Sequence, residues 1–248
     1  MLVASKTDLI ALRKIGRIVA LAREEMIKAI KPGISTIELD TIGEEVLLKY
    51  GARSAPKYEY NFPGSTCISL NDVAAHGIPS SRIIKEGDII NIDISAELDG
   101  YFSDTGATIP VGSISSIKKN LIDCSRSALD KAIKTSKAGV KINEIGKAIH
   151  NEARKHSFTV IKNLAGHGIG KVLHDSPNLI LNYYDKHDHR VLKKGMVLAL
   201  ETFISTRAEY AIEQKDGWTL KTPDGSFVAQ FEHTIVVTEK EPIVLTLV

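Results

Sequence analysis

The sequence is poor in cysteine and in long apolar runs, and both shortages exclude classes of protein. Its only cysteines are Cys67 and Cys124, and it has no CxxC pair, so a disulfide framework is excluded and a reducing compartment is favoured. No apolar run approaches the roughly 18 residues of a membrane span, and the N-terminus lacks the pattern of a secretory signal. We therefore expect a cytoplasmic protein without a membrane partner.

An excess of charge of one sign is also missing. The 32 basic and 30 acidic residues are interspersed and give a formal net charge of +2. A nucleic-acid-binding protein normally carries a basic stripe, so nucleic acid is not an expected partner. With 43% hydrophobic and 25% charged residues, the composition is that of an ordinary globular protein.

Helix signals occur in two pairs. Apolar residues recur at three- and four-residue steps after Thr7, which we expect to cap the first helix, until Lys31-Pro32-Gly33 ends it. Ser35 and Glu38 form an S-x-x-E capping box for a second helix. The predicted helices cover about residues 7–30, 35–50, 116–136 and 142–157.

Short segments rich in β-branched residues predict strands, and one pair predicts a hairpin. Asp99-Gly100 is a two-residue turn signal, and closing the hairpin there pairs Asp93 with Gly106 and Ser95 with Asp104. Asp93 and Asp104 would then be diagonal neighbours on one face of the sheet. Because Gly106 has no side chain, it would leave space there for a pair of bound ions. A solvated sheet face would explain an isolated pair equally well, and a β-bulge would break the register. The predicted strands cover residues 66–70, 88–96, 101–111, 195–203 and 227–237.

Traces of a duplication run through the chain. KPGI at residues 31–34 recurs as KAGV at 137–140, and GDIINID at 87–93 recurs as GMVLALE at 195–201. An acidic residue ends both copies of the second string. We predict an α+β fold in one domain, residues 1–248, with two pseudo-symmetric halves at about 5–112 and 113–248 and the functional site between them.

Four acids and one histidine lie in hydrophobic contexts where a solvated charge is not expected: Asp93, Asp104, His167, Glu201 and Glu232. A buried carboxylate is costly unless it is paired or bound to a metal, and four together would repel one another. Two divalent ions would neutralise their charge. Oxygen ligands with one imidazole and no thiolate favour Mn, Fe(II), Co or Zn in a two-metal hydrolase over a structural zinc site.

Two further histidines lie in loop-like sequence near these residues. His76 and His174 are candidates for proton transfer or for stabilising an oxyanion, although an isolated histidine is more often structural. His233 should point to the opposite face from Glu232 and is not a candidate.

The strings that carry these residues resemble the type I methionine aminopeptidases, the bacterial and organellar form, from about Lys31 to the end of the chain. The matching motifs are KPGIS, NFPGSTCISLNDVAAHGIPS, GDIINIDISAELDGYFSDTGATIPVG, IGKAIHNEAR, LAGHGIGKVLHDSP, KKGMVLALETFI and VAQFEHTIVVT. The resemblance implies the pita-bread (creatinase/aminopeptidase) fold, in which two halves of antiparallel sheet are flanked by helices. It implies that Asp93, Asp104 and Glu232 bind a first metal, and that Asp104, His167, Glu201 and Glu232 bind a second.

The function implied by the resemblance is removal of the initiator methionine from nascent proteins when the second residue is small. A hydroxide bridging two metal ions would attack the scissile carbonyl, with Glu201 shuttling the proton. His76 and His174 would bind substrate and assist catalysis. The methionine pocket would be lined by Phe62, Cys67 and Trp218, with Tyr58 or Tyr60 beside them.

The resemblance also implies cofactors and partners. Two divalent ions, Co, Mn, Fe(II) or Zn, are expected, and a monovalent cation near residues 71–73 is a further candidate. N-terminal methionyl peptides are the expected substrates, the ribosome is a further candidate partner, and we expect a monomer.

Two departures from the family pattern keep alternatives open. Thr202 stands where the family usually has proline, and Leu173 where it often has an aromatic residue. One alternative is a weakly active or non-catalytic protein of the same fold with a binding or regulatory role. Another is a proline-specific peptidase of this fold, although those chains carry an additional N-terminal domain.

Overall fold

A computed structural model describes all residues from Met1 to Val248. Its centre is a curved antiparallel sheet in the order β1-β4-β5-β12-β9-β7-β8, with β2, β6 and β13 paired to its inner strands. The helices are α1 (Lys6–Ala29), α2 (Thr36–Lys49), α3 (Ala55–Tyr60), α4 (Ser116–Thr135) and α5 (Ile142–Lys155). The strands of this sheet are β1 (Arg53–Ser54), β2 (Cys67–Leu70), β4 (Ile89–Leu98), β5 (Tyr101–Pro110), β6 (Thr159–Val160), β7 (Ala165–Gly168), β8 (Asp175–Leu181), β9 (Val197–Ser205), β12 (Val228–Val236) and β13 (Ile243–Val244). A small second sheet contains β3 (Val73–Ala75), β10 (Ile212–Glu213) and β11 (Leu220–Lys221).

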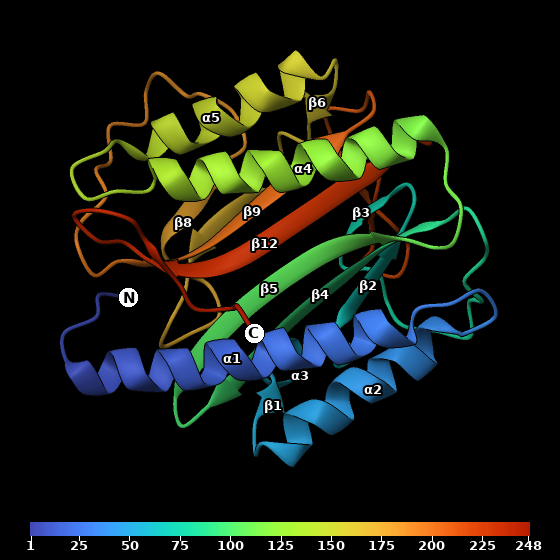
Figure 1. The fold of residues 1–248 in the computed structure, drawn as a ribbon, viewed down its shortest axis with the longest axis horizontal. Coiled ribbons are helices and arrows are strands. Elements are labelled where there is room, and N and C mark those ends of the chain that lie inside the picture. The colour runs from blue at the N-terminus through green and yellow to red at the C-terminus, as the bar shows by residue number, and fades with distance from the viewer.

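The helices form two pairs that lie along different halves of the sheet (Figure 1). Helix α1 packs on β4 and β5, and α2 packs against α1. In the other half, α4 packs on β9 and β12, and α5 packs against α4. The join between the halves is the pairing of β5 with β12. The predicted fold class, α+β with antiparallel strands flanked by helices, is confirmed. No helix is both long and apolar enough to cross a membrane.

The first helix begins earlier than expected. Its N-cap is Ser5, not Thr7: the Ser5 Oγ accepts from the Asp8 N–H at 3.1 Å, and the Asp8 carboxylate accepts from the Ser5 N–H at 2.9 Å. The periodicity of apolar residues concealed this box because both of its members precede the apolar stripe. The second predicted box is confirmed, with the Ser35 N–H donating to the Glu38 carboxylate at 2.8 Å.

The hairpin of β4 and β5 has the predicted register. Asp99 and Gly100 have φ values of 54° and 78°, the left-handed conformation that a two-residue turn of this twist requires at both positions. Asp93 pairs with Gly106 and Ser95 with Asp104, without a bulge between them. The two aspartates therefore lie on the same face of the sheet, on adjacent strands.

The repeated strings close equivalent loops in both halves. Gly33 and Gly139 have φ values of 96° and 89°, and their N–H groups donate to Ile84 O and Leu192 O, each at 2.9 Å. The second pair of strings repeats this equivalence, with Gly87 N–H bonded to Val111 O and Gly195 N–H to Val237 O, each at 2.9 Å. The exact bounds of the halves, 5–112 and 113–248, stay a prediction.

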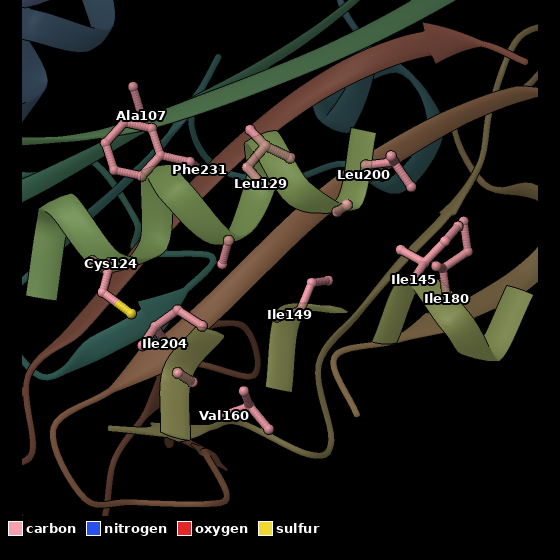
Figure 2. Close-up of a cluster of buried hydrophobic side chains, with 14 of the residues drawn as sticks. Ala107, Cys124, Leu129, Ile145, Ile149, Val160, Ile180, Leu200, Ile204 and Phe231 are labelled. Atoms are coloured by element: carbon pink, nitrogen blue, oxygen red, sulfur yellow. The ribbon is translucent and has the colours of Figure 1, made fainter. Parts of the chain in front are cut away.

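The larger hydrophobic core fills the space between α4, α5 and the strands beneath them (Figure 2). Leu200 and Ile204 of β9 point into this core, and so does Cys124 of α4, which is fully buried. Side chains alternate between the faces of a strand, so Glu201 must point away from the helices. The same holds for Asp93 on β4, because Ile92 and Ile94 pack under α1 and α2. Asp93 and Glu201 therefore lie on the face of the sheet opposite these helices.

Candidate metal centre and substrate pocket

A single pocket, on the face of the sheet opposite α1, α2, α4 and α5, is lined by the ten residues that were assigned to the metal site, to catalysis or to the wall of the methionine pocket. Its volume is about 100 Å³. The predicted residues that line it are Phe62, Cys67, His76, Asp93, Asp104, His167, His174, Glu201, Trp218 and Glu232. Pro56, Tyr60, Ser95 and Leu173 line it as well.

Strand pairing brings the acids together. Glu201 on β9 lies directly opposite Glu232 on β12, and Glu232 in turn lies opposite Gly106 on β5. Gly106 also pairs with Asp93 on the other side, and Asp104 lies two residues before Gly106 on β5, so four adjacent strands bring acids to one point. Asp104 is 8% exposed and Glu232 is 2% exposed. The four carboxyl groups therefore share a site with little water.

The pKa values of these carboxyl groups show that their negative charges are unfavourable without cations nearby. Burial raises the pKa of Asp104 to about 6. Burial and repulsion from neighbouring carboxylates raise the pKa values of Asp93, Glu201 and Glu232 well above their usual range. Four carboxyl groups in this arrangement cannot all ionise near neutral pH unless cations lie among them.

Unpaired atoms in the pocket test whether a metal would fit. Asp104 Oδ1 and Glu232 Oε1 are buried without a hydrogen-bond partner, although a buried oxygen of this kind normally has one. Ligand atoms of Asp104, His167 and Glu232 lie within 4.8 Å of one another. The residues present fit a divalent cation, since orphaned carboxylate oxygens and an imidazole nitrogen converge on one point.

His167 is prepared to act as a ligand. Burial lowers its pKa to about 3, so the ring is neutral. Its Nδ1 lies 2.9 Å from Gly168 O, and because a carbonyl can only accept, Nδ1 must carry the proton. The unprotonated Nε2 then faces the acids, 3.7 Å from Glu201 Oε1, with its lone pair free for a metal.

Gln230 was missed from the sequence, and it explains the need for glycine at position 106. The space into which a side chain at Gly106 would project is filled. It is occupied by the Gln230 side chain, with which a Cβ at Gly106 would collide. Gln230 Nε2 donates to Glu232 Oε2 at 3.0 Å, and Asn91 Nδ2 donates to Gln230 Oε1 at 2.8 Å. A signal for Gln230 was present, because residues two apart on a strand share a face.

The two further histidines lie at the wall of the pocket. His76 follows β3 in a left-handed conformation with a φ of 54°, and loss of water lowers its pKa, with a smaller effect from His174. The His174 ring lies 4.3 Å from the His167 ring between centroids. His174 Nδ1 is 2.7 Å from the hydroxyl of Tyr60.

The apolar side of the pocket contains the predicted methionine-binding residues. Phe62 and Trp218 meet edge to face, with ring centroids 5.2 Å apart, and Cys67 lies opposite Asp93 in the sheet. Of the two tyrosines considered, Tyr60 lines the pocket. Tyr58 lies outside, with its ring 3.3 Å from the guanidinium carbon of Arg53.

The two unusual residues have defined places. Thr202 is fully buried on the helix side of β9, and its hydroxyl lies 2.8 Å from the Ser125 hydroxyl of α4. It therefore ties β9 to the helix layer. Leu173 is 3% exposed and lines the pocket beside His174. Near residues 71–73 the Asn71 carbonyl accepts from the Val228 N–H at 2.9 Å, and a monovalent cation there stays a prediction.

Comparison with known proteins agrees with this geometry. The profile of Metallopeptidase family M24 matches residues 11–239. A Bacillus subtilis protein named methionine aminopeptidase 2 is 56% identical, over 99% of both chains. The crystal structure of methionine aminopeptidase from Thermotoga maritima superposes with a TM-score of 0.95 at 35% identity, covering 99% of each chain.

A more distant structure shares the fold of this chain but has low sequence identity to it. Prolidase from Pyrococcus furiosus has a TM-score of 0.79 at 24% identity, and the match covers 66% of that longer chain. It supports only the shared architecture, so the pita-bread fold is confirmed while proline specificity gains no support. The chain belongs to metallopeptidase family M24.

Proposed function

We propose that this protein is a type I methionine aminopeptidase, which removes the initiator methionine from nascent proteins when the second residue is small. One observation carries the proposal: a single pocket has a cluster of buried carboxylates and a histidine on one side and an apolar wall of two aromatic rings and a thiol on the other. The relatives named methionine aminopeptidase support methionine as the residue removed, and the preference for a small second residue comes from the resemblance of the motifs.

The acids and His167 would hold two divalent ions. Asp93, Asp104 and Glu232 are assigned to the first, and Asp104, His167, Glu201 and Glu232 to the second. Support comes from the orphaned oxygens of Asp104 and Glu232 and from the raised pKa values of the group. When bound, ions such as Co, Mn, Fe(II) or Zn supply the Lewis acidity that polarises a carbonyl and makes water nucleophilic at neutral pH.

The chain's own residues then have distinct tasks. Glu201 takes the proton of the attacking water and returns it to the leaving nitrogen, since its carboxylate lies in the pocket beside the other acids. His174 donates a hydrogen bond to the carbonyl oxygen as negative charge develops there. His76 contacts the scissile nitrogen.

The apolar wall selects the methionine side chain. A thioether is polarisable and packs well against aromatic edges and sulfur, which Phe62, Trp218 and Cys67 offer together. A branched or charged side chain would lose these contacts. The same proposal includes a cytoplasmic monomer that acts on chains as they leave the ribosome.

The test is hydrolysis of short peptides by metal-loaded protein. Protein treated with chelator and reloaded with Mn(II) or Co(II) is expected to release methionine from Met-Ala-Ser and to leave Met-Lys-Ser intact. Calorimetry on the same sample confirms that metal is bound. If metal-bound protein left Met-Ala-Ser uncut, the proposed activity would be wrong.

A further inference from the structure

Glu59 and Tyr60 at the end of α3 contact Leu173 and His174, which precede β8. The Tyr60 hydroxyl is 2.7 Å from His174 Nδ1, and the ring centroids are 5.5 Å apart with an interplanar angle of 46°. Next to it, the Glu59 carboxylate accepts from the Leu173 N–H at 3.4 Å. These contacts join the first half of the chain to the second at the mouth of the pocket.

The chemistry of the two rings decides which one donates. The ordinary pKa values of tyrosine and histidine leave both side chains mainly neutral near pH 7, and the partner of His174 Nδ1 is a phenol and not a carboxylate. A phenol is a stronger acid than a neutral imidazole, and an imidazole nitrogen is a stronger base than a phenolic oxygen. The hydroxyl of Tyr60 therefore donates and His174 Nδ1 accepts.

The direction of this hydrogen bond determines whether His174 Nε2 carries a proton. A neutral histidine has one protonated nitrogen, so an accepting Nδ1 leaves the proton on Nε2. Nε2 of His174 has no hydrogen-bond partner within the protein, and the side chain lines the pocket. An N–H can stabilise an oxyanion there, whereas the lone pair of the other tautomer would repel it.

We propose that Tyr60 is a positioning residue that holds His174 in the Nε2–H tautomer and aims a hydrogen-bond donor at the substrate carbonyl. The inference rests on the proposed function for the use made of that donor. The tautomer itself can be measured without substrate, so the two can fail separately.

Kinetics supply the first test. Tyr60→Phe keeps the ring and removes the hydroxyl, and we expect kcat on Met-Ala-Ser to fall about tenfold, as is typical when the partner that orients an active-site histidine is lost. KM should change by less than about twofold, because the ring that lines the pocket remains. Tyr58→Phe, on the same helix but outside the pocket, is the matched control and should keep wild-type kcat.

Coupling to His174 separates positioning from a general structural effect. In a His174→Gln background, Tyr60→Phe should cost no further activity, because the group it orients is gone. A repeated tenfold loss in that background would mean that Tyr60 acts by another route and would overturn the proposal.

Spectroscopy reads the tautomer directly. Protein labelled with ¹⁵N-histidine and loaded with diamagnetic Zn(II) is expected to show His174 with an unprotonated Nδ1, in signals assigned by their loss in His174→Gln. Tyr60→Phe should shift this residue toward protonated Nδ1, and Tyr58→Phe should not. An unchanged His174 tautomer in Tyr60→Phe would refute the inference even if the enzyme were active. A shifted tautomer in protein that hydrolyses no peptide would support it while removing the proposed function.

Discussion

Two glutamates buried to the same degree behave in opposite ways. Glu152 between α4 and α5 is 3% exposed, and Glu232 in the pocket is 2% exposed. Burial alone would raise the pKa of both. Hydrogen bonds from Lys131 and Ser127 outweigh burial at Glu152 and lower its pKa, whereas burial and the surrounding carboxylates raise the pKa of Glu232 well above the usual range.

The contrast shows what separates a structural acid from a functional one. Glu152 has a positive partner within the chain, so its charge is compensated where the two helices pack. Glu232 has Gln230 as its only polar partner and acids around it, and one of its oxygens is unpaired. Such a group lowers the stability of the protein unless a cation from outside completes it. We therefore expect the pocket to depend on a bound cation and the helix layer to be independent of one.

The largest expected effect is on metal binding in the pocket. Asp104→Ala removes a proposed shared ligand and should weaken Mn(II) binding by more than about a hundredfold, measured by calorimetry. His76→Ala should bind metal as the wild type does and lose turnover. If His76→Ala lost metal as well, the division between ligands and catalytic histidines would be wrong.

The helix layer should respond in stability instead. Glu152→Gln removes charged hydrogen bonds and should lower the free energy of unfolding by about 1 to 3 kcal/mol at pH 7, measured with urea. Because the folded pKa of Glu152 is lowered, its contribution is present above the unfolded pKa of about 4.3 and is lost as pH falls through the folded value. The difference between wild type and variant should shrink below about pH 4. A difference that stayed constant with pH would show that the charge is not responsible.

A smaller effect is expected at Gly106. Gly106→Ala should push the amide of Gln230 away from Glu232 and weaken metal binding about tenfold. In a Gln230→Ala background the added methyl group has room, so the same substitution should change metal affinity little. Equal losses in both backgrounds would mean that Gly106 matters for a reason other than Gln230.

The smallest effect is expected at Thr202, on the helix side of the strand that carries Glu201. Thr202→Val keeps the shape and removes the hydrogen bonds to Ser125, which should cost roughly 1 kcal/mol of stability and leave metal affinity unchanged. Thermal unfolding and calorimetry on the same sample measure both. A clear loss of metal affinity in Thr202→Val would contradict this prediction and would show that the hydroxyl contributes to the metal centre.

Much of the site could be predicted because its spacing is local. The turn at Asp99-Gly100 determines the register of β4 and β5, and with it the shared face of Asp93 and Asp104. The apolar neighbours of Glu201 and Glu232 indicated that these acids lie on core strands, and both line the pocket. The capping box at Ser35 involves residues three apart, so no tertiary information was needed.

What could not be predicted depends on contacts between distant segments. The six-residue helix α3 is too short for a periodic pattern, so the approach of Tyr60 to His174 had no signal in the sequence. Gln230 reaches Glu232 through space that Gly106 leaves on a different strand. The position of Ser5 as the cap of α1 was hidden because a helix can begin before its apolar stripe does.

The most direct test of a metal-dependent pocket compares the two buried glutamates. Chelator-treated Glu232→Gln and Glu152→Gln proteins would be titrated with Mn(II) by calorimetry beside the wild type. We predict that Glu152→Gln binds the metal with wild-type affinity and that Glu232→Gln loses at least about tenfold. Wild-type affinity in Glu232→Gln, or an equal loss in both variants, would contradict the assignment of the pocket as a metal centre.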